Sequence, residues 1–177
     1  KYIDLFLIHF PSPNEGVTAA TWKALEEAKD SGIVRSIGVS NFMRGDLKEL
    51  LENSRIKPVV NQLEINPFNL MEEVDDFGYD NNSMTMAYSP LAKGRALEDG
   101  KVMKIAEKYN KTPAQIILRW AVQRDLIPIP KTKDADRMKE NLDLFDFSLT
   151  DEELERITRI KKDSNFVKGH QDHNLGK

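Results

Sequence analysis

Short apolar runs alternate with amphipathic segments along most of this chain. The apolar runs lie at residues 3–10, 33–39, 59–65, 84–89 and 126–130. Their length and their apolar character predict five β-strands. The first run is apolar on both faces, so we expect it to be buried between two layers, as strands of parallel sheets are.

The segments between these runs have helical spacing. Trp22, Leu25 and Ala28 share one face of a helix that we expect to be capped by Thr18 and ended by Gly32. We expect further helices at residues 47–51, 71–82, 102–109, 113–121, 137–142 and 150–160. The last of these starts with a capping-box pattern, Thr150 with Glu153, whereas residues 90–100 are expected to form a loop.

Five strands separated by helices predict an α/β fold with right-handed βαβ units and a parallel sheet. Both an open doubly wound sheet and a (β/α)8 barrel fit this pattern. A complete barrel needs eight strands and about 250 residues, so a barrel made by this chain would be incomplete. We expect residues 1–177 to form a single domain, in which residues 164–177 are a polar C-terminal tail.

Composition narrows the function classes. The 177 residues are 40% hydrophobic and 31% charged, which is typical of globular proteins with one core. No apolar run approaches the roughly 20 residues that span a bilayer, so we expect no membrane partner. The net charge is −3 and basic residues do not cluster, which argues against a general nucleic-acid binder.

The chain contains no cysteine, so it offers no disulfide, no thiolate zinc site and no thiol nucleophile. This composition fits a reducing compartment, and we expect a cytoplasmic protein. We expect no metal site, because His170 and His173 lack further ligands near them. An apolar run follows Lys1 directly and there is no initiator Met, so we expect residues to be missing before Lys1.

Polar side chains fall where the predicted strands end. They are His9, then Ser40 and Asn41, then Asn61, Gln62 and Glu64, then Tyr88 and Ser89, then Lys131 and Thr132. Each one alone fits a turn, a helix cap or a core aromatic. Because the carboxyl ends of parallel strands converge, five polar ends in succession predict a functional site there. Neither G-x-G-x-x-G nor G-x-x-x-x-G-K-[ST] occurs, so a dinucleotide would not be bound in the Rossmann manner.

Five segments, in this order and spacing, closely resemble the aldo-keto reductases. They read YIDLFLIHFP at 2–11, GVSNF at 38–42, NQLEINP at 61–67, AYSPL at 87–91 and IPKT at 129–132. The resemblance extends from Lys1 to about Asp163. It implies a (β/α)8 TIM-barrel-type fold, here incomplete, with about five βα units from the fourth barrel strand onward. It also implies NADPH-dependent reduction of aldehydes and ketones to alcohols.

The resemblance gives His9 a catalytic role, as the counterpart of the histidine in the family's set of Asp, Tyr, Lys and His. There it would help to orient the carbonyl oxygen, whereas the other three residues would lie before Lys1. We therefore expect this chain alone to have little or no reductase activity. The alternative is a non-catalytic nucleotide-binding or interaction protein built on a truncated barrel. Open sheet edges in either case would favour self-association.

The nicotinamide end of the cofactor would be held by residues that the resemblance assigns at three strand ends. Ser40, Asn41 and Gln62 would bind the carboxamide, and Tyr88 would stack on the ring. Asn and Gln supply both donors and acceptors, and an aromatic face holds a planar ring in one orientation. The segment from Ser89 to Leu91 would lie at the pyrophosphate.

The adenosine end would be bound after the fifth strand. By the same resemblance, Lys131, Thr132 and Arg137 would bind a 2′-phosphate, since a guanidinium fork and a point charge suit a dianion. This favours NADPH over NADH. Glu140 and Asn141 share a helix face with Arg137 and would approach the adenine. The alternative is a solvated face with an Arg137–Glu140 pair. The substrate would be a small carbonyl compound that the sequence does not name.

Overall fold

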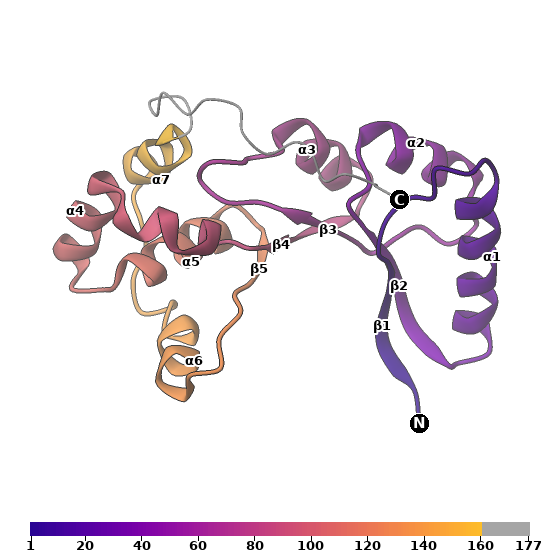
Figure 1. The fold of residues 1–177 in the computed structure, drawn as a ribbon, viewed down its shortest axis with the longest axis horizontal. Helices are drawn as coiled ribbons and strands as arrows, with labels where there is room; N and C mark the ends of the chain where they lie inside the picture. Colours follow the sequence, from indigo (N-terminus) through magenta and orange to yellow (C-terminus); the bar gives the residue numbers. More distant parts are fainter. Residues whose placement is uncertain (161–177) are drawn as a thin grey trace, which may run out of the picture.

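The computed structural model describes residues 1–160 (Figure 1). The expected tail at 164–177, with His170 and His173, lies outside the described residues. Within residues 1–160, five strands form one sheet in the order β1-β2-β3-β4-β5, and every neighbouring pair is parallel. The strands are β1 (Ile3–Ile8), β2 (Val34–Ser40), β3 (Val60–Glu64), β4 (Met84–Tyr88) and β5 (Ile127–Ile129). The predicted α/β class with a parallel sheet is confirmed.

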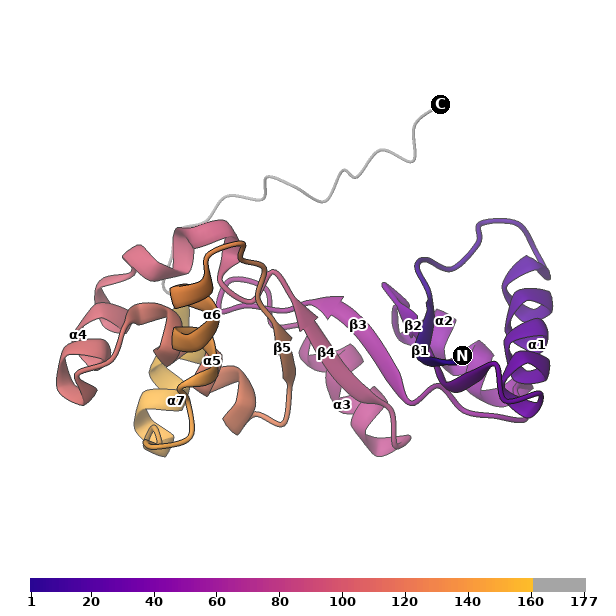
Figure 2. The same cartoon turned by 90° about the horizontal axis from the view of Figure 1, so that it is seen from below.

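Helices connect the strands and lie along the outer side of a curved sheet. They are α1 (Val17–Asp30), α2 (Arg44–Asn53), α3 (Glu72–Asp80), the 3-10 helix η1 (Ala92–Glu98), α4 (Gly100–Tyr109), α5 (Pro113–Gln123), α6 (Ala135–Leu142) and α7 (Asp151–Thr158). Figure 2 shows α1 beside β1 and β2 at one end, and α4 to α7 gathered beyond β5 at the other. Among residues 1–160, no helix is both long enough and apolar enough to span a membrane.

Buried apolar side chains fill the space between the sheet and these helices. One cluster joins α1, β2 and α2 through Trp22, Ile37 and Leu47, each at most 2% exposed. A second and larger cluster joins β3 and β4 to helices α3, α4, α5 and α7 and includes Trp120 and Ile157. Burying side chains of this size stabilises a fold by about 1.5–3 kcal/mol each. These clusters therefore set the position of the strands whose ends carry the site.

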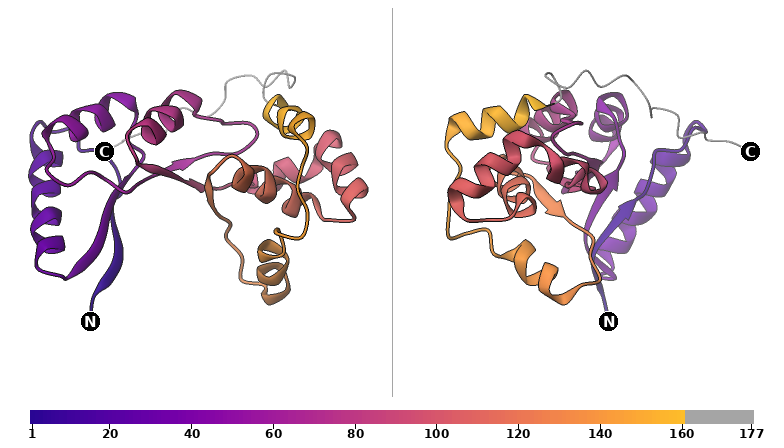
Figure 3. Two further views of the ribbon diagram at one scale, coloured as in Figure 1. Left: turned by 180° about the vertical axis from the view of Figure 1, so that it is seen from behind. Right: turned by 60° about the vertical axis from the view of Figure 1, so that its left-hand side comes forward.

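The expectation that the first strand is buried on both faces is wrong. β1 is an edge strand, and Ile3 and Phe6 are 44% and 43% exposed. The described residues provide β1 with a neighbour on one side only, namely β2. Figure 3 shows this strand, which carries the N-terminus, at the outer edge of the sheet. An apolar run reports what a strand tends to bury, but the neighbouring elements decide what is covered.

Two local expectations also need correction. Helix α1 starts after Gly16, which has a left-handed φ of 76°, rather than after Thr18. The Thr18 hydroxyl instead accepts a 2.8 Å hydrogen bond from the Ser12 N–H and so closes the loop before the helix. The expected loop at 90–100 contains η1, which is interrupted at Lys93 and Gly94 by positive φ values of 56° and 92°.

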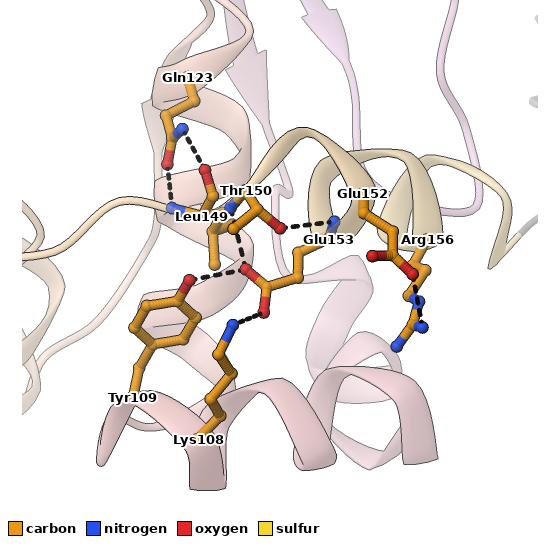
Figure 4. Close-up of polar contacts among 8 residues, drawn as sticks. All are labelled: Lys108, Tyr109, Gln123, Leu149, Thr150, Glu152, Glu153 and Arg156. Carbon is orange, nitrogen blue, oxygen red and sulfur yellow. Dashed lines mark hydrogen bonds and ion pairs between the residues drawn. The ribbon is translucent and has the colours of Figure 1, made fainter.

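The predicted capping box at the last helix is present and belongs to a larger cluster of polar contacts (Figure 4). The Glu153 carboxylate accepts hydrogen bonds from Lys108 Nζ at 2.6 Å, the Tyr109 hydroxyl at 2.7 Å and the Thr150 N–H at 2.9 Å. Burial by itself would raise the pKa of Glu153, but these hydrogen bonds lower it to about 2. The cluster fastens α7 to α4.

Candidate functional site

Asn41 lies at the centre of the polar groups that gather at the carboxyl ends of β1 to β4. Its Nδ2 donates to the His9 carbonyl at 3.0 Å and to Ser40 Oγ at 3.1 Å, and its Oδ1 accepts from the Tyr88 hydroxyl at 3.2 Å. Its backbone φ is 60°, in the left-handed region that Asn tolerates better than most residues. This conformation turns the chain immediately after β2 and so places the Asn41 amide between the ends of β1 and β4.

Ser40 and Gln62 are paired neighbours in the sheet. The Ser40 hydroxyl, 3% exposed, donates to the Gln62 carbonyl at 2.9 Å. The Gln62 side chain is half-buried, and its Nε2 donates to the Met86 thioether at 3.2 Å. A thioether is a weak acceptor, so this amide can exchange the contact for a stronger one with a ligand.

Tyr88 ends β4 next to Glu64 in the register of the sheet. Burial, and to a lesser extent the negative charge of Glu64, raises the pKa of Tyr88 above its usual value of 10.0. The hydroxyl therefore stays protonated at neutral pH and remains a donor to Asn41. The ring is half-buried, which fixes its position and leaves one part of it accessible.

His9 directly follows β1 and is exposed. Its ring centroid lies 4.6 Å from that of Phe10. Its backbone carbonyl accepts the hydrogen bond from Asn41, which ties the end of β1 to the end of β2. The structure thus brings His9, Ser40, Asn41 and Tyr88 into one connected group, with Gln62 on the strand between them.

The loop after β4 has an unusual backbone. Ser89, Ala92 and Lys93 have φ values of 48°, 49° and 56°, although none of them is glycine. The Ser89 carbonyl accepts hydrogen bonds from the Ala92 N–H at 2.9 Å and from Asn66 Nδ2 at 3.4 Å. Left-handed non-glycine residues are energetically unfavourable and cluster at sites where the chain must hold a particular shape. Ser89 and the half-buried Leu91 belong to this loop.

Cationic side chains gather after β5. An open pocket of about 430 Å³ is lined by Lys131, Thr132, Lys133, Asp134 and Arg137. Asp134 caps α6, since its side chain accepts from the N–H groups of Arg137 and Asp136, and these hydrogen bonds lower the pKa of Asp134. Three cations and a hydroxyl around one hollow at the start of a helix suit a phosphate group.

Glu140 and Asn141 do not line this pocket. Glu140 Oε1 accepts a 2.6 Å hydrogen bond from the Thr112 hydroxyl at the start of α5. Among residues 1–160, Arg137 and Glu140 form no ion pair, so the solvated Arg137–Glu140 pair is not found there. Arg137, Glu140 and Asn141 lie on the same helix, α6, as predicted. The Glu140 carboxylate, however, is already hydrogen-bonded to Thr112 at the start of α5.

A cavity of about 940 Å³ lies elsewhere. It is bounded by α1, α2 and the loop before α1, and none of the predicted site residues lines it. Hydrogen-bonding groups that converge on one point define the site better than cavity size does. Within residues 1–160, no three His, Cys, Asp or Glu side chains are arranged to hold a metal ion.

Two asparagines beside the site have roles that the sequence pattern did not reveal. Asn61 and Asn66 are 2% and 3% exposed, and their amides bind backbone carbonyls of the loops after β2 and β4. Asn61 stands out in the sequence as a polar residue within an apolar strand. Strand alternation alone, however, does not show which carbonyl such an amide meets.

These features agree with the comparisons to known proteins. The sequence profile of the Aldo/keto reductase family matches residues 1–162. The chain is 42% identical over 162 residues to the glyoxal reductase of Bacillus subtilis (strain 168), a match that covers 92% of this chain and 58% of that protein. It is 40% identical to the methylglyoxal reductase DkgA of Yersinia pestis, over 90% of this chain and 58% of that protein. The chain belongs to the aldo-keto reductase family and spans somewhat more than half the length of these relatives.

Solved structures agree with this assignment. A variant of Gox0644 in complex with NADPH superimposes with a TM-score of 0.88 at 41% identity, over 95% of this chain and 62% of that one. The Bombyx mori aldo-keto reductase in complex with NADP gives a TM-score of 0.83 at 40% identity, over 89% of this chain and 57% of that one. The chain therefore has the fold of part of a (β/α)8 barrel of this family.

Proposed function

We propose that this chain is the cofactor-binding part of an NADPH-dependent reductase that converts small aldehydes or ketones to alcohols. The observation that carries the proposal is the arrangement around Asn41, where amide, hydroxyl and aromatic groups from three adjacent strands converge. When bound, NADPH supplies a hydride to the carbonyl carbon. This chain's residues would bind and orient the cofactor and the carbonyl group.

At the nicotinamide end, the donor set fits a carboxamide. The Gln62 amide offers a donor and an acceptor, since its Nε2 is bonded only to the Met86 thioether. Asn41 and Ser40 use their donors within the chain, but Asn41 Oδ1 and Ser40 Oγ each keep a further lone pair as an acceptor. The Tyr88 ring is held by its hydrogen bond to Asn41, so it can present one face to a planar ring. Ser89 and Leu91 would lie beside the pyrophosphate, where backbone groups of the strained loop are accessible.

At the adenosine end, the pocket after β5 fits a 2′-phosphate. Lys131 and Arg137 line it from a loop and from a helix, and Thr132 contributes a hydroxyl. This favours NADPH over NADH, because a ribose without the phosphate would leave the cations unpaired. We propose that Glu140 and Asn141 lie near the adenine. Glu140 would contribute less to binding, since its carboxylate already accepts a hydrogen bond from Thr112.

His9 is the catalytic residue that we propose within this chain, where it would donate a hydrogen bond to the carbonyl oxygen of the substrate. The relatives named above are a glyoxal reductase and a methylglyoxal reductase, so we propose small reactive carbonyl compounds as the substrate class. We also propose a cytoplasmic location, which the absence of cysteine fits.

We propose further that this chain alone binds NADPH without reducing carbonyl compounds, because it offers one of the family's four catalytic residues. Titration of NADPH, followed by its fluorescence, should show saturable binding that Asn41→Ala weakens. Asn53→Ala is the control, since the amide of Asn53 bonds to its own helix at Glu49. With methylglyoxal added, no NADPH should be consumed. Absence of binding by the folded chain would refute the cofactor assignment. Turnover that is lost on His9→Ala would refute the expected inactivity.

The second candidate is a non-catalytic nucleotide-binding protein that associates through its sheet edge. The exposure of Tyr2, Ile3, Phe6 and Phe10 along β1 favours it, since an apolar unpaired edge invites another strand. Light scattering after size exclusion decides the matter. A dimer that Phe6→Lys dissociates supports self-association, and a monomer at every concentration contradicts it.

A further inference from the structure

We propose that Asn61 and Asn66 are positioning residues that hold the two cofactor-binding loops on either side of β3. The consequence for the cofactor rests on the function proposed above, whereas the loop contacts themselves do not. β3 is the middle strand of the sheet, between β2 and β4. Asn61 reaches the loop after β2, and Asn66 reaches the loop after β4.

Asn61 fixes the turn that carries Asn41. Its Nδ2 donates a buried hydrogen bond of 2.8 Å to the carbonyl of Phe42, the residue after Asn41. The Asn41 N–H donates to the Gln62 carbonyl at 2.9 Å. Two hydrogen bonds therefore tie the left-handed turn to β3, one through the Asn41 N–H and one through the Phe42 carbonyl. This leaves the Asn41 side chain one position between His9 and Tyr88.

The chemistry of Asn61 indicates that its role is to donate the hydrogen bond to the Phe42 carbonyl. Its Oδ1 is buried and has no hydrogen-bond partner within the described residues, which is unfavourable for stability. Leu63 and Ile65 lie two and four positions after Asn61, on the same side of the extended chain, and pack in the hydrophobic core. An apolar residue at position 61 would avoid the unpaired oxygen but would leave the Phe42 carbonyl without this donor. The reverse amide orientation would place two acceptors against each other, so the assigned orientation follows from the contact.

Asn66 acts in the same way on the other side. Asn66 is held in a tight turn by three hydrogen bonds. Its N–H donates to the Asn69 carbonyl at 3.0 Å, and its carbonyl accepts from the Asn69 N–H at 2.8 Å. Its Oδ1 accepts from the Phe68 N–H at 3.1 Å. From that turn its Nδ2 donates to the Ser89 carbonyl at 3.4 Å. Ser89 has a φ of 48°, so this donor supports the backbone that starts the strained loop.

Both asparagines thus support a left-handed residue in a loop proposed to contact the cofactor. Such backbone conformations persist only where surrounding contacts over-determine them. Both asparagines are buried and their amides bind backbone carbonyls of Phe42 and Ser89, so we propose no contact of either side chain with the cofactor. Their effect on the cofactor must pass through Asn41 and through the loop after β4.

The first test needs no cofactor. Hydrogen–deuterium exchange is measured on the chain and on Asn61→Leu and Asn66→Leu, with Asn81→Leu as control, since the Asn81 amide bonds to Phe77 at the end of α3. Asn61→Leu should speed exchange in residues 41–43 and leave 89–92 unchanged, and Asn66→Leu should do the reverse. The proposal would be overturned if each variant increased exchange equally in both loops, or if neither variant changed exchange in either loop.

The second test measures NADP⁺ binding by calorimetry as a function of pH. Asn61→Leu and Asn66→Leu should each weaken binding by about tenfold, a change of one unit in log Kd. In the Asn61→Asp variant, an ionised carboxylate faces the Phe42 carbonyl and binding is weak. Burial raises the pKa of such a carboxyl, and its protonated form can donate. The Kd of the Asn61→Asp variant, divided by that of the unmodified chain, should therefore fall towards one as the pH is lowered.

The positioning role would be overturned if the Kd ratio of Asn61→Asp to the unmodified chain did not depend on pH and Asn61→Leu bound NADP⁺ normally. Failure of the unmodified chain to bind NADP⁺ would instead refute the proposed function. In that case the exchange measurement alone decides whether the two asparagines hold their loops.

Discussion

The Tyr88 hydroxyl donates a hydrogen bond of 3.2 Å to Asn41 Oδ1, which joins the end of β4 to the end of β2 across the intervening strand β3. The two residues are 47 positions apart in the chain. This contact fixes the direction of an aromatic ring and of an amide at the same time. A ligand that stacks on one of them and bonds to the other meets groups that are already oriented.

Tyr88→Phe should weaken NADPH binding modestly. The change removes the hydroxyl that orients Asn41 but keeps the ring, and a neutral hydrogen bond contributes about 0.5–1.5 kcal/mol, or roughly two- to twelvefold in Kd. Tyr88→Leu should weaken binding further, because the stacking face is also lost. Fluorescence titration of both variants gives the two steps. Equal affinity of the chain and Tyr88→Leu would exclude stacking at this position.

Arg137→Ala should reduce selectivity for NADPH. The guanidinium lines the pocket after β5, and a charge-assisted hydrogen bond to phosphate contributes about 1.5–3 kcal/mol, or roughly 10- to 100-fold in affinity. NADH binding should not change, because it has no 2′-phosphate. Lys139→Ala is the matched control, since Lys139 lies on the same helix and pairs with Asp136 outside the pocket. A parallel loss for NADPH and NADH would contradict the 2′-phosphate assignment.

Gly38→Ala should destabilise the chain. A Cβ at this position would lie 2.7 Å from the Val60 carbonyl oxygen and 2.8 Å from Leu7 Cδ2, so neighbouring strands would have to shift. Such overpacking costs about 1–3 kcal/mol in the free energy of unfolding. Gly45→Ala in α2 is the opposite case, because nothing lies within 4 Å of its added Cβ. It should stabilise the helix by about 0.5–1 kcal/mol. Urea unfolding of both variants measures the difference.

Glu153 should make the stability of the chain depend on acid pH. Burial opposes ionisation of its carboxyl, but the hydrogen bonds from Lys108 and Thr150 outweigh that effect and lower the pKa from 4.5 to about 2 in the folded state. The carboxylate therefore contributes its full stability above pH 4.5 and loses it as the pH falls from 4.5 towards 2. A difference of this size corresponds to roughly 3 kcal/mol.

Glu153→Gln should remove most of that dependence, which urea unfolding at pH values from about 2 to above 4.5 would show. Glu152→Gln is the control, since Glu152 is exposed and pairs with Arg156 at 2.8 Å on the same helix (Figure 4). Exposed pairs of this kind contribute little. An unchanged pH profile in Glu153→Gln would show that the Lys108–Glu153 contact does not hold α7 in solution.

Local patterns predicted the elements well where neighbouring residues encode them. The predicted capping box of Thr150 with Glu153 forms within three residues of sequence, and it is present. Gly16 as the start of α1 was missed, because its left-handed backbone leaves no polar side-chain signal. The interrupted helix η1 was missed for a related reason, since Ala92 and Lys93 ordinarily avoid positive φ.

The amino-acid pattern was sufficient to predict the alternation of strands and helices, the parallel sheet that this alternation requires, and the polar residues at the strand ends. These features depend on periodicity and on short-range caps, which are properties of neighbouring residues. Three features follow from the packing of distant segments. β1 is exposed, the Thr112 hydroxyl donates to the Glu140 carboxylate, and the Asn61 and Asn66 amides bind loop carbonyls. Those contacts join residues 19 to 28 positions apart, so they depend on how strands register and helices pack. No local pattern carries that information.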